Sequence, residues 1–134
     1  MSHNIDWATL SGFKTTASLT GQTFAGGYSP TDINGWNITI PNSVNGAKYF
    51  VEACAPYMEL GTAYRQLSLT YSNNTEFGTF IEQRGASDHY GMKVSGICEG
   101  NGSDLQVKLR VILNNPGTTS GRVDGGYIRW ERVS

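Results

Sequence analysis

Histidine is the side chain most often used for acid–base catalysis near neutral pH, and the chain contains only His3 and His89. Because His89 follows Asp88 and serines are plentiful, a Ser-His-Asp hydrolase has to be considered. Adjacent residues on an extended chain point to opposite faces, however, so Asp88 cannot orient His89 without a special turn. The Gly-x-Ser-x-Gly sequence of many hydrolases is also missing. We therefore expect a loop histidine, and a protein that is not an enzyme.

Other catalytic and cofactor-binding signatures are missing as well. The 11 acidic residues are scattered, and no two stand out as the carboxylate pair of a glycoside hydrolase. The sequence has no Walker loop, Rossmann fingerprint or EF-hand. Cys54 and Cys98 have neither CxxC spacing nor a neighbouring histidine cluster, so we expect no metal and no cofactor. A disulfide between them remains open, although two buried thiols fit better.

Recognition of a surface ligand is the chemistry that remains. Aromatic rings beside amide, hydroxyl and charged groups can stack on a sugar and hydrogen-bond its hydroxyls. Two segments expected to be loops or strand ends combine such residues. The candidates are Tyr57, Glu59, Tyr64, Arg84, Asp88, His89 and Tyr90. For any single one of them, ordinary packing within a loop is the competing explanation.

The composition limits the class of protein. The 134 residues suffice for one compact domain with its own core. The formal net charge of -1 lacks the basic excess with which nucleic-acid binders meet phosphates. Hydrophobic residues make up 38% of the chain, too many for a disordered segment. Neither an apolar run of membrane-spanning length nor a basic-then-apolar N-terminus is present, so we expect no nucleic-acid partner, no membrane span and no secretory signal.

Turn residues and apolar alternation predict strands rather than helices. Turn signals such as Asn-Gly recur about every 8–12 residues, which is typical of β-sandwiches and barrels. Residues 104–113 alternate Leu and Val with Gln, Lys and Arg, and residues 65–71 alternate similarly. Such strands have one face in the core and one in water. The first 30 residues predict only an irregular strand and a loop.

Three other predicted strands, 49–55, 90–97 and 127–133, carry apolar residues on both faces. A sandwich strand has only one face in its own core, so apolar residues on the second face need another cover. Packing under long loops is one explanation, and contact with a second subunit is the other. Beside the two one-sided strands, this pattern favours a sandwich in which one sheet faces water and the other faces a partner subunit.

Residues 36–134 present these strands and turns in a recognisable order. After Asn45, Gly-Ala-Lys-Tyr-Phe-Val-Glu-Ala precedes Arg-Gln-Leu-Ser-Leu-Thr-Tyr-Ser-Asn-Asn. Two later strands, 92–99 and 105–109, are joined by Asn-Gly-Ser-Asp, and the chain closes with Gly-Gly-Tyr-Ile-Arg-Trp at 125–130. This order is similar to that of the tumour-necrosis-factor and complement-head jelly rolls.

The resemblance implies an all-β, antiparallel two-sheet jelly roll over residues 1–134, assembled as a homotrimer around its inner sheets. The interface candidates are Tyr49, Phe50, Tyr90, Met92, Tyr127 and Trp130. The low charge and the Gly-, Ser-, Thr- and Asn-rich composition also resemble bacteriophage tail tips. We therefore expect a non-enzymatic knob of a phage tail needle or tail fibre, located in the virion, with a host-surface glycan or envelope component as its partner.

Two other roles stay open at this point. One is an extracellular carbohydrate-binding module of a larger glycan-active protein, and the other is a small hydrolase. A fibrous stalk is expected upstream of residue 1, and residues 1–3 have the look of a tag remnant. Three subunits in solution would favour the head, whereas sugar binding by a monomer would favour the module.

Overall fold

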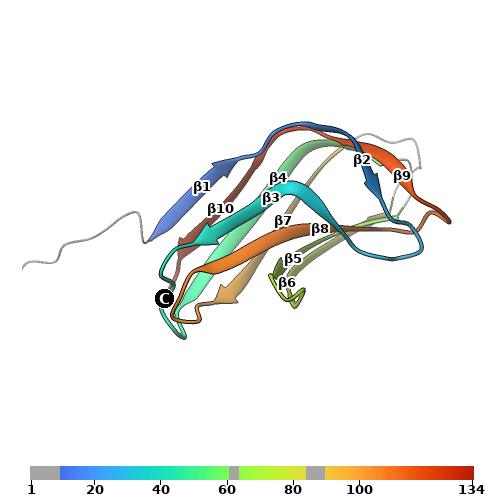
Figure 1. Cartoon of the computed structure of the whole chain (residues 1–134). Coiled ribbons are helices and arrows are strands. Elements are labelled where there is room, and N and C mark those ends of the chain that lie inside the picture. Colours follow the sequence, from blue (N-terminus) through green and yellow to red (C-terminus); the bar gives the residue numbers. More distant parts are fainter. Residues whose placement is uncertain (1–9, 61–63, 84–89) are drawn as a thin grey trace, which may run out of the picture.

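The computed structural model describes residues 10–60, 64–83 and 90–134, apart from the side chains of Gln83 and Tyr90. Within these ranges the chain consists of strands and loops (Figure 1). The strands are β1 (Ser11–Thr15), β2 (Leu19–Phe24), β3 (Thr31–Ile40), β4 (Lys48–Glu59), β5 (Tyr64–Tyr71), β6 (Glu76–Gln83), β7 (Tyr90–Glu99), β8 (Leu105–Leu113), β9 (Thr119–Val123) and β10 (Tyr127–Arg132).

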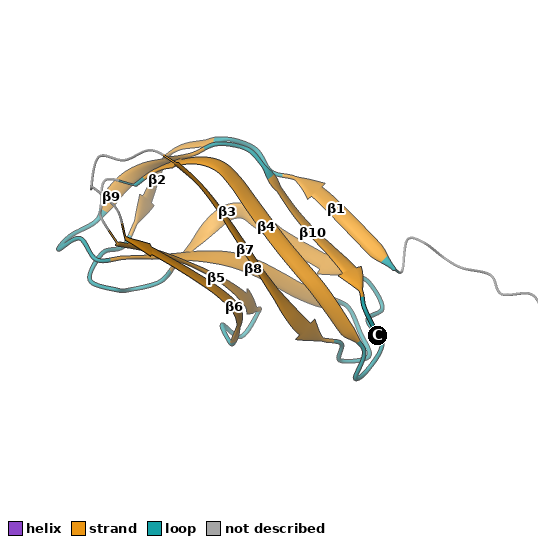
Figure 2. Ribbon diagram, turned by 180° about the vertical axis from the view of Figure 1, so that it is seen from behind, coloured by secondary structure: helices purple, strands orange, loops and turns teal. Residues whose placement is uncertain are grey.

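The strands form two antiparallel sheets packed face to face, which Figures 1 and 2 show from opposite sides. In sheet A, β4 pairs with β7 along one edge and with β10 and then β9 along the other. β1 pairs with β10, and β2 pairs with β9. Sheet B has the order β3-β8-β5-β6. β1 and β2 are two parts of one strand path, and β9 and β10 are two parts of another. Counting each path once gives four strands in each sheet, which is the arrangement of a jelly roll. The predicted all-β sandwich of two antiparallel sheets is confirmed, and the homotrimer stays a prediction.

Both interrupted paths break at the same place. Residues 16–18 separate β1 from β2, and residues 124–126 separate β9 from β10. The backbone N–H of Thr16 donates to the carbonyl of Gly126 at 3.0 Å, and the N–H of Gly126 donates to Oγ1 of Thr16 at 2.8 Å. A Cβ on Gly126 would collide with the carbonyl oxygen of Cys54, so only glycine fits. The Asp-Gly-Gly segment is therefore an irregularity within a continuing path.

Large side chains from both sheets fill the interior. Trp36 of sheet B and Trp130 of sheet A are at most 2% exposed, and Tyr49 packs edge-on against Trp130 with ring centroids 5.7 Å apart. In β8 the apolar residues are buried while the Gln, Lys and Arg between them stand on the outer face. The prediction of a one-sided strand at 104–113 is confirmed.

The strands with two apolar faces all belong to sheet A, where β4 lies between β7 and β10. The one-sided strands β5 and β8 are neighbours in sheet B. The two kinds of predicted strand therefore fall in different sheets. The outer face of sheet B is mainly polar along β5 and β8, although Ile81 of β6 in the same sheet is 56% exposed. Contact of sheet A with a partner subunit stays a prediction.

The two open sides of the sandwich are bridged differently. On one side β6 meets β7, where Gly78 and Gly96 let the two backbones touch; a Cβ on Gly96 would collide with the carbonyl oxygen of Phe77. On the other side, Lys14 of β1 and Gln22 of β2 reach across to β3. Both seams thus join sheet A to sheet B.

Two segments differ from the sequence prediction. Residues 11–24, expected to be an irregular strand and a loop, form β1 and β2, because pairing with β10 and β9 orders a stretch that lacks apolar alternation. Asn34-Gly35, expected to be a turn, lies inside β3, where the register against β8 shifts between Asp32 and Asn37. Gly35 has a φ of 80° there, a backbone conformation that glycine adopts freely.

Candidate functional site

Tyr57 and Glu59 lie in a strand rather than in the predicted loop. Pro56 sits at a bulge between Ala55 and Met58, where its missing N–H is tolerated. Beyond the bulge β4 continues and pairs with β9. Both side chains are therefore held on a rigid element at the end of sheet A.

Arg122, on the neighbouring strand β9, lies against Tyr57, which in turn contacts Glu59. The guanidinium of Arg122 lies 4.9 Å from the ring centre of Tyr57, whose hydroxyl donates to Glu59 at 3.4 Å. Arg122 also donates to both carboxylate oxygens of Asp124, from Nε at 2.8 Å and from Nη2 at 3.3 Å. The hydrogen bond to Asp124 raises the pKa of Arg122, so this group is a permanent cation. A hollow of about 280 Å³ opens beside Glu59 and Arg122.

Tyr64 lies on the other sheet, at the start of β5. Its ring packs edge-on against Tyr28 with centroids 5.3 Å apart, and its hydroxyl donates to Gln66 at 2.9 Å. Tyr28 is 60% exposed and was not singled out from the sequence, because it stands alone in a Gly- and Ser-rich stretch. The first predicted segment is thus divided between the two sheets.

The second predicted segment falls mostly outside the described residues. Arg84, Asp88 and His89 lie there, and so does the side chain of Tyr90, although its backbone begins β7. Over the described part of the chain, no cluster of His, Cys, Asp and Glu could hold a metal ion. The same part contains no helix long and apolar enough to cross a membrane.

The outer face of sheet A carries apolar side chains around a charged centre. We call this face the sheet A surface, and its defining residues are Phe13, Phe50, Glu52, Ile97, Tyr127 and Arg129. Phe13 is 64% and Ile97 48% exposed. Phe13 stacks on Tyr127 at 5.3 Å between centroids, and Arg129 lies 5.2 Å from the ring centre of Phe50.

Glu52 occupies the centre of the sheet A surface, with a side chain only 12% exposed. The Tyr127 hydroxyl donates to it at 2.6 Å and Arg129 Nε donates at 3.3 Å, while Lys93 Nζ lies 4.0 Å away. The Tyr127 hydrogen bond, and then Arg129, hold the pKa of Glu52 below its usual range despite burial. The same hydrogen bond raises the pKa of Tyr127 to about 12.

Three of the predicted interface residues are not on this surface. Tyr49, Met92 and Trp130 are 1%, 3% and 2% exposed and pack inside the sandwich, so they cannot also contact another subunit. Successive side chains in a strand alternate between faces, which puts Phe50 outside and its neighbour inside. Phe50 and Tyr127 remain available.

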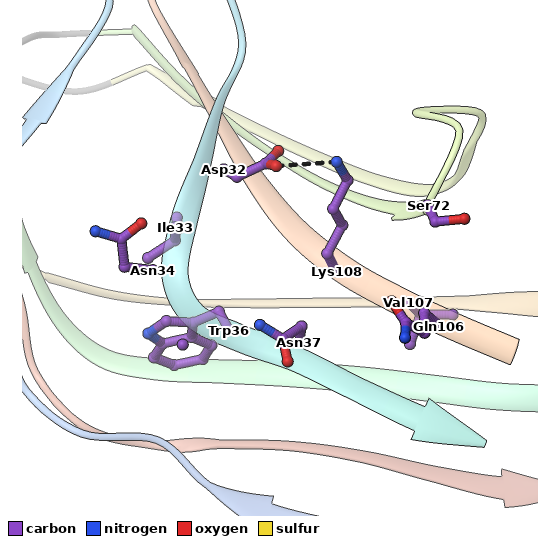
Figure 3. Close-up of a pocket in the computed structure, with 10 residues that line it drawn as sticks. Asp32, Ile33, Asn34, Trp36, Asn37, Ser72, Gln106, Val107 and Lys108 are labelled. Atoms are coloured by element: carbon purple, nitrogen blue, oxygen red, sulfur yellow. Dashed lines mark hydrogen bonds and ion pairs between the residues drawn. The ribbon is translucent and has the colours of Figure 1, made fainter. Parts of the chain in front are cut away.

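A polar groove that the sequence did not predict lies on sheet B, at the β3 bulge. One hollow of about 330 Å³, whose lining residues Figure 3 shows, adjoins another of about 690 Å³. The two hollows share Asp32, Asn34 and Lys108. We call the combined hollow the bulge groove. The only sequence signal was Asn34-Gly35 within an apolar-polar alternation, which was interpreted as a turn.

Side chains from sheet A hold the bulge in place. The Gln22 amide donates to the carbonyl of Asp32 at 2.7 Å and accepts from the N–H of Asn34 at 3.0 Å. Lys14 Nζ donates to the carbonyl of Asn37 at 3.0 Å. These three hydrogen bonds satisfy backbone groups at and beside the bulge and tie it to sheet A.

An ion-pair network crosses the bulge groove. Lys108 Nζ lies 2.9 Å and Arg110 Nε 3.6 Å from the carboxylate oxygens of Asp32. The cations lie against the sheet, with side chains 22% and 14% exposed, whereas Asp32 is 55% exposed. Trp36 lines the same groove but is 1% exposed, and its Nε1 has no partner among the described residues.

The cysteines are both free thiols on opposite faces of sheet A. Cys98 faces the core and burial raises its pKa to about 11, whereas Cys54 is half-buried on the outer face. The interpretation of two thiols is supported, with only one of them fully buried.

Comparison with known proteins gives the fold but no family. No protein-family model and no curated protein sequence matches the chain. Among solved structures, PRD1 vertex protein P5 aligns with a TM-score of 0.53 at 11% identity, covering 94% of this chain and 98% of that one. This chain is a jelly-roll β-sandwich. A structure of infectious bursal disease virus, Gt strain, aligns at 0.49 with 12% identity, over 91% of this chain and 33% of that one. The C-terminal CBM6 of LamC, a marine laminarinase from Zobellia galactanivorans, aligns at 0.43 with 11% identity, over 90% and 99%.

Proposed function

We propose that this domain is the non-enzymatic head of a bacteriophage tail needle or tail fibre, a homotrimer whose subunits meet through the sheet A surface. The observation that carries the proposal is the sheet A surface itself. A single chain leaves Phe13 and Ile97 largely uncovered beside two further aromatic rings. The full-length fold likeness to PRD1 vertex protein P5 supports a place in a virion.

The charged centre of the sheet A surface is compatible with burial in an interface. A buried charge is costly unless it is paired and hydrogen-bonded. Glu52 already has Tyr127, Arg129 and Lys93 around it, and Arg129 also lies 3.8 Å from Glu131. Two carboxylates and two cations therefore balance within one subunit, and covering them leaves no charge without a partner.

The candidate recognition residues lie at the end of the fold that a stalk would leave free. Leu10 accepts a hydrogen bond from Arg132, and Lys48 accepts one from Val133, so the N-terminal and C-terminal strands meet where β4 begins (Figure 1). Tyr57 and Glu59 lie at the other end of this 12-residue strand. A head carried on an upstream stalk would present that end to the host envelope, and three copies would multiply weak contacts by avidity.

Sedimentation equilibrium at micromolar concentration tests the trimer. The expected mass is about three times the 14.6 kDa of one chain. Ile97→Glu should shift the protein to monomer. Ile81→Glu is the matched control, because Ile81 is an isoleucine 56% exposed in sheet B. A wild-type monomer, or equal disruption by both variants, would overturn the sheet A interface, and sugar binding by such a monomer would favour a carbohydrate-binding module.

Host contact is tested separately on the assembled protein. Tyr57→Ala and Tyr64→Ala should leave the trimer intact and weaken attachment to susceptible cells. If neither change alters attachment, the free end of the head does not read the host surface.

A further inference from the structure

We infer that the bulge groove is a binding site for a neutral carbohydrate, recognised through its neighbouring hydroxyl groups. The groove lies on sheet B and involves none of the residues proposed for assembly or host contact, so this inference does not depend on the proposed function.

The bulge groove results from a specific interruption of β3 that side chains of the other sheet stabilise. An uninterrupted β3 would pair with β8 residue by residue, but Ile33–Trp36 stand opposite a single position of β8. Such bulges occur preferentially beside functional sites, where they redirect side chains. Here Gln22 and Lys14, two side chains from the opposite sheet, are committed to holding the bulge open. The indole N–H of Trp36, which lines the groove, has no partner among the described residues.

The groove offers free hydrogen-bonding groups of both kinds. Asn34, Asn74 and Gln106 line it, and their side-chain amides make no hydrogen bond to other described residues. Amides donate and accept at once. Asp32 is fixed by Lys108 and Arg110 but remains open to solvent, so its carboxylate can accept further hydrogen bonds. Because these ion pairs hold the Asp32 carboxylate in place, it can bind with little loss of side-chain entropy.

The charges select the class of ligand. A phosphate would approach Lys108 and Arg110 but would also meet the carboxylate of Asp32, with which both are paired. A metal ion would meet the two cations. Trp36, the one aromatic residue among those lining the described hollows, is buried, so an apolar ligand finds no exposed ring to stack on. Neighbouring sugar hydroxyls, which both donate and accept, match an acceptor carboxylate flanked by donor cations and amides. The two hollows fall within the size range of small-molecule sites.

The test is an amide chemical-shift titration of the ¹⁵N-labelled protein with millimolar cellotriose, maltotriose, lactose and rhamnose, and separately with inorganic phosphate. At least one sugar should shift the backbone amides of Asn34, Asn37 and Lys108 in a saturable way. Asp32→Ala should weaken that binding about tenfold or more, because charge-assisted hydrogen bonds to the sugar are lost.

Glu99→Ala is the matched control. Glu99 is 53% exposed and pairs with Lys48 at 3.1 Å, so its replacement removes a similar ion pair outside the groove. It should leave sugar binding unchanged. Gln106→Ala provides a second, exposed groove variant, with an expected loss of several fold.

Three results would overturn the inference: no sugar shifts the groove amides, Asp32→Ala and Glu99→Ala bind alike, or phosphate alone binds. The last result would make the groove an anion site. None of these measurements reports the oligomeric state, so failure here and failure of the trimer are distinguishable.

Discussion

Replacing Glu52 by glutamine removes one negative charge from the centre of the sheet A surface with almost no change in shape. The carboxylate now accepts a 2.6 Å hydrogen bond from Tyr127 and a 3.3 Å one from Arg129, and it is 12% exposed. Hydrogen bonds to charged groups contribute about 1.5–3 kcal/mol each, and a glutamine oxygen retains roughly half of that. Glu52→Gln should therefore lower the free energy of unfolding by about 2 kcal/mol at neutral pH.

The pH dependence of this loss identifies its cause. The native pKa of Glu52 lies below its ordinary value. The carboxylate therefore stabilises the fold fully at pH values above the ordinary pKa, and this stabilisation is lost as pH falls through the native pKa. The difference between wild type and Glu52→Gln should therefore shrink as pH falls through this lowered pKa. The pKa of Tyr127 is raised to about 12, so its contribution is complete below its ordinary value of 10.0 and is lost as pH rises through about 12.

Urea unfolding followed by tryptophan fluorescence, at one protein concentration for all variants, measures both effects. Glu99→Gln is the control, because the exposed Lys48–Glu99 pair should contribute less than about 1 kcal/mol. An equal loss in both variants, or a loss for Glu52→Gln that persists unchanged in acid, would refute the assignment of Glu52 as a stabilising buried carboxylate.

Three further predictions concern the core, the two cysteine thiols and the contact between β6 and β7. Val107→Asp should unfold the domain in a urea titration, with a loss of about 4 kcal/mol or more, because it puts an unpaired charge in the core. Gln106→Asp on the outer face of the same strand should change stability by less than about 0.5 kcal/mol. In the native protein Cys54 should react with Ellman's reagent much faster than Cys98, whose pKa burial raises to about 11. Gly96→Ala should lower the melting temperature, at a cost of roughly 1–3 kcal/mol, because its Cβ collides with the β6 backbone.

Each of these has a result that would contradict it. Equal losses at positions 107 and 106 would mean that β8 does not have one dry and one wet face. Equal reaction rates would mean that Cys98 is accessible. Gly117→Ala is the control for the seam, since no atom lies within 4 Å of its added Cβ. If both alanine variants melted alike, β6 and β7 would not be in close contact.

Local patterns predicted the strands whose two faces differ in polarity. Residues 104–113 became β8 because alternation alone places Leu and Val inside, and it needs no knowledge of neighbouring strands. The strands 49–55, 90–97 and 127–133 were recognised as different, and they share a sheet. Which of their residues face outward was not resolved, and Tyr49 was assigned to the wrong face for that reason.

Features that depend on distant pairing were out of reach. β2 and β9 are rich in Thr, Ser and Gly and are ordered by one another. The β3 bulge depends on Gln22, which is 10 residues from Asp32 in sequence and belongs to the other sheet. Asn34-Gly35 carries the same local signal whether it forms a hairpin turn or a bulge, so the groove could not be predicted from that signal.

The contacts that join the edges of the two sheets also affect how copies of this domain can associate. A strand at the edge of a sheet exposes unpaired N–H and C=O groups that can recruit another chain, and such recruitment is a common route to aggregation. Here β6 and β7 lie against each other through Gly78 and Gly96, while β3 is bent by its bulge and held by Lys14 and Gln22. Copies of this domain held at high local density are therefore disfavoured from joining edge to edge into fibres. Any contact between them is directed to the sheet faces, where it can close into an assembly of fixed size.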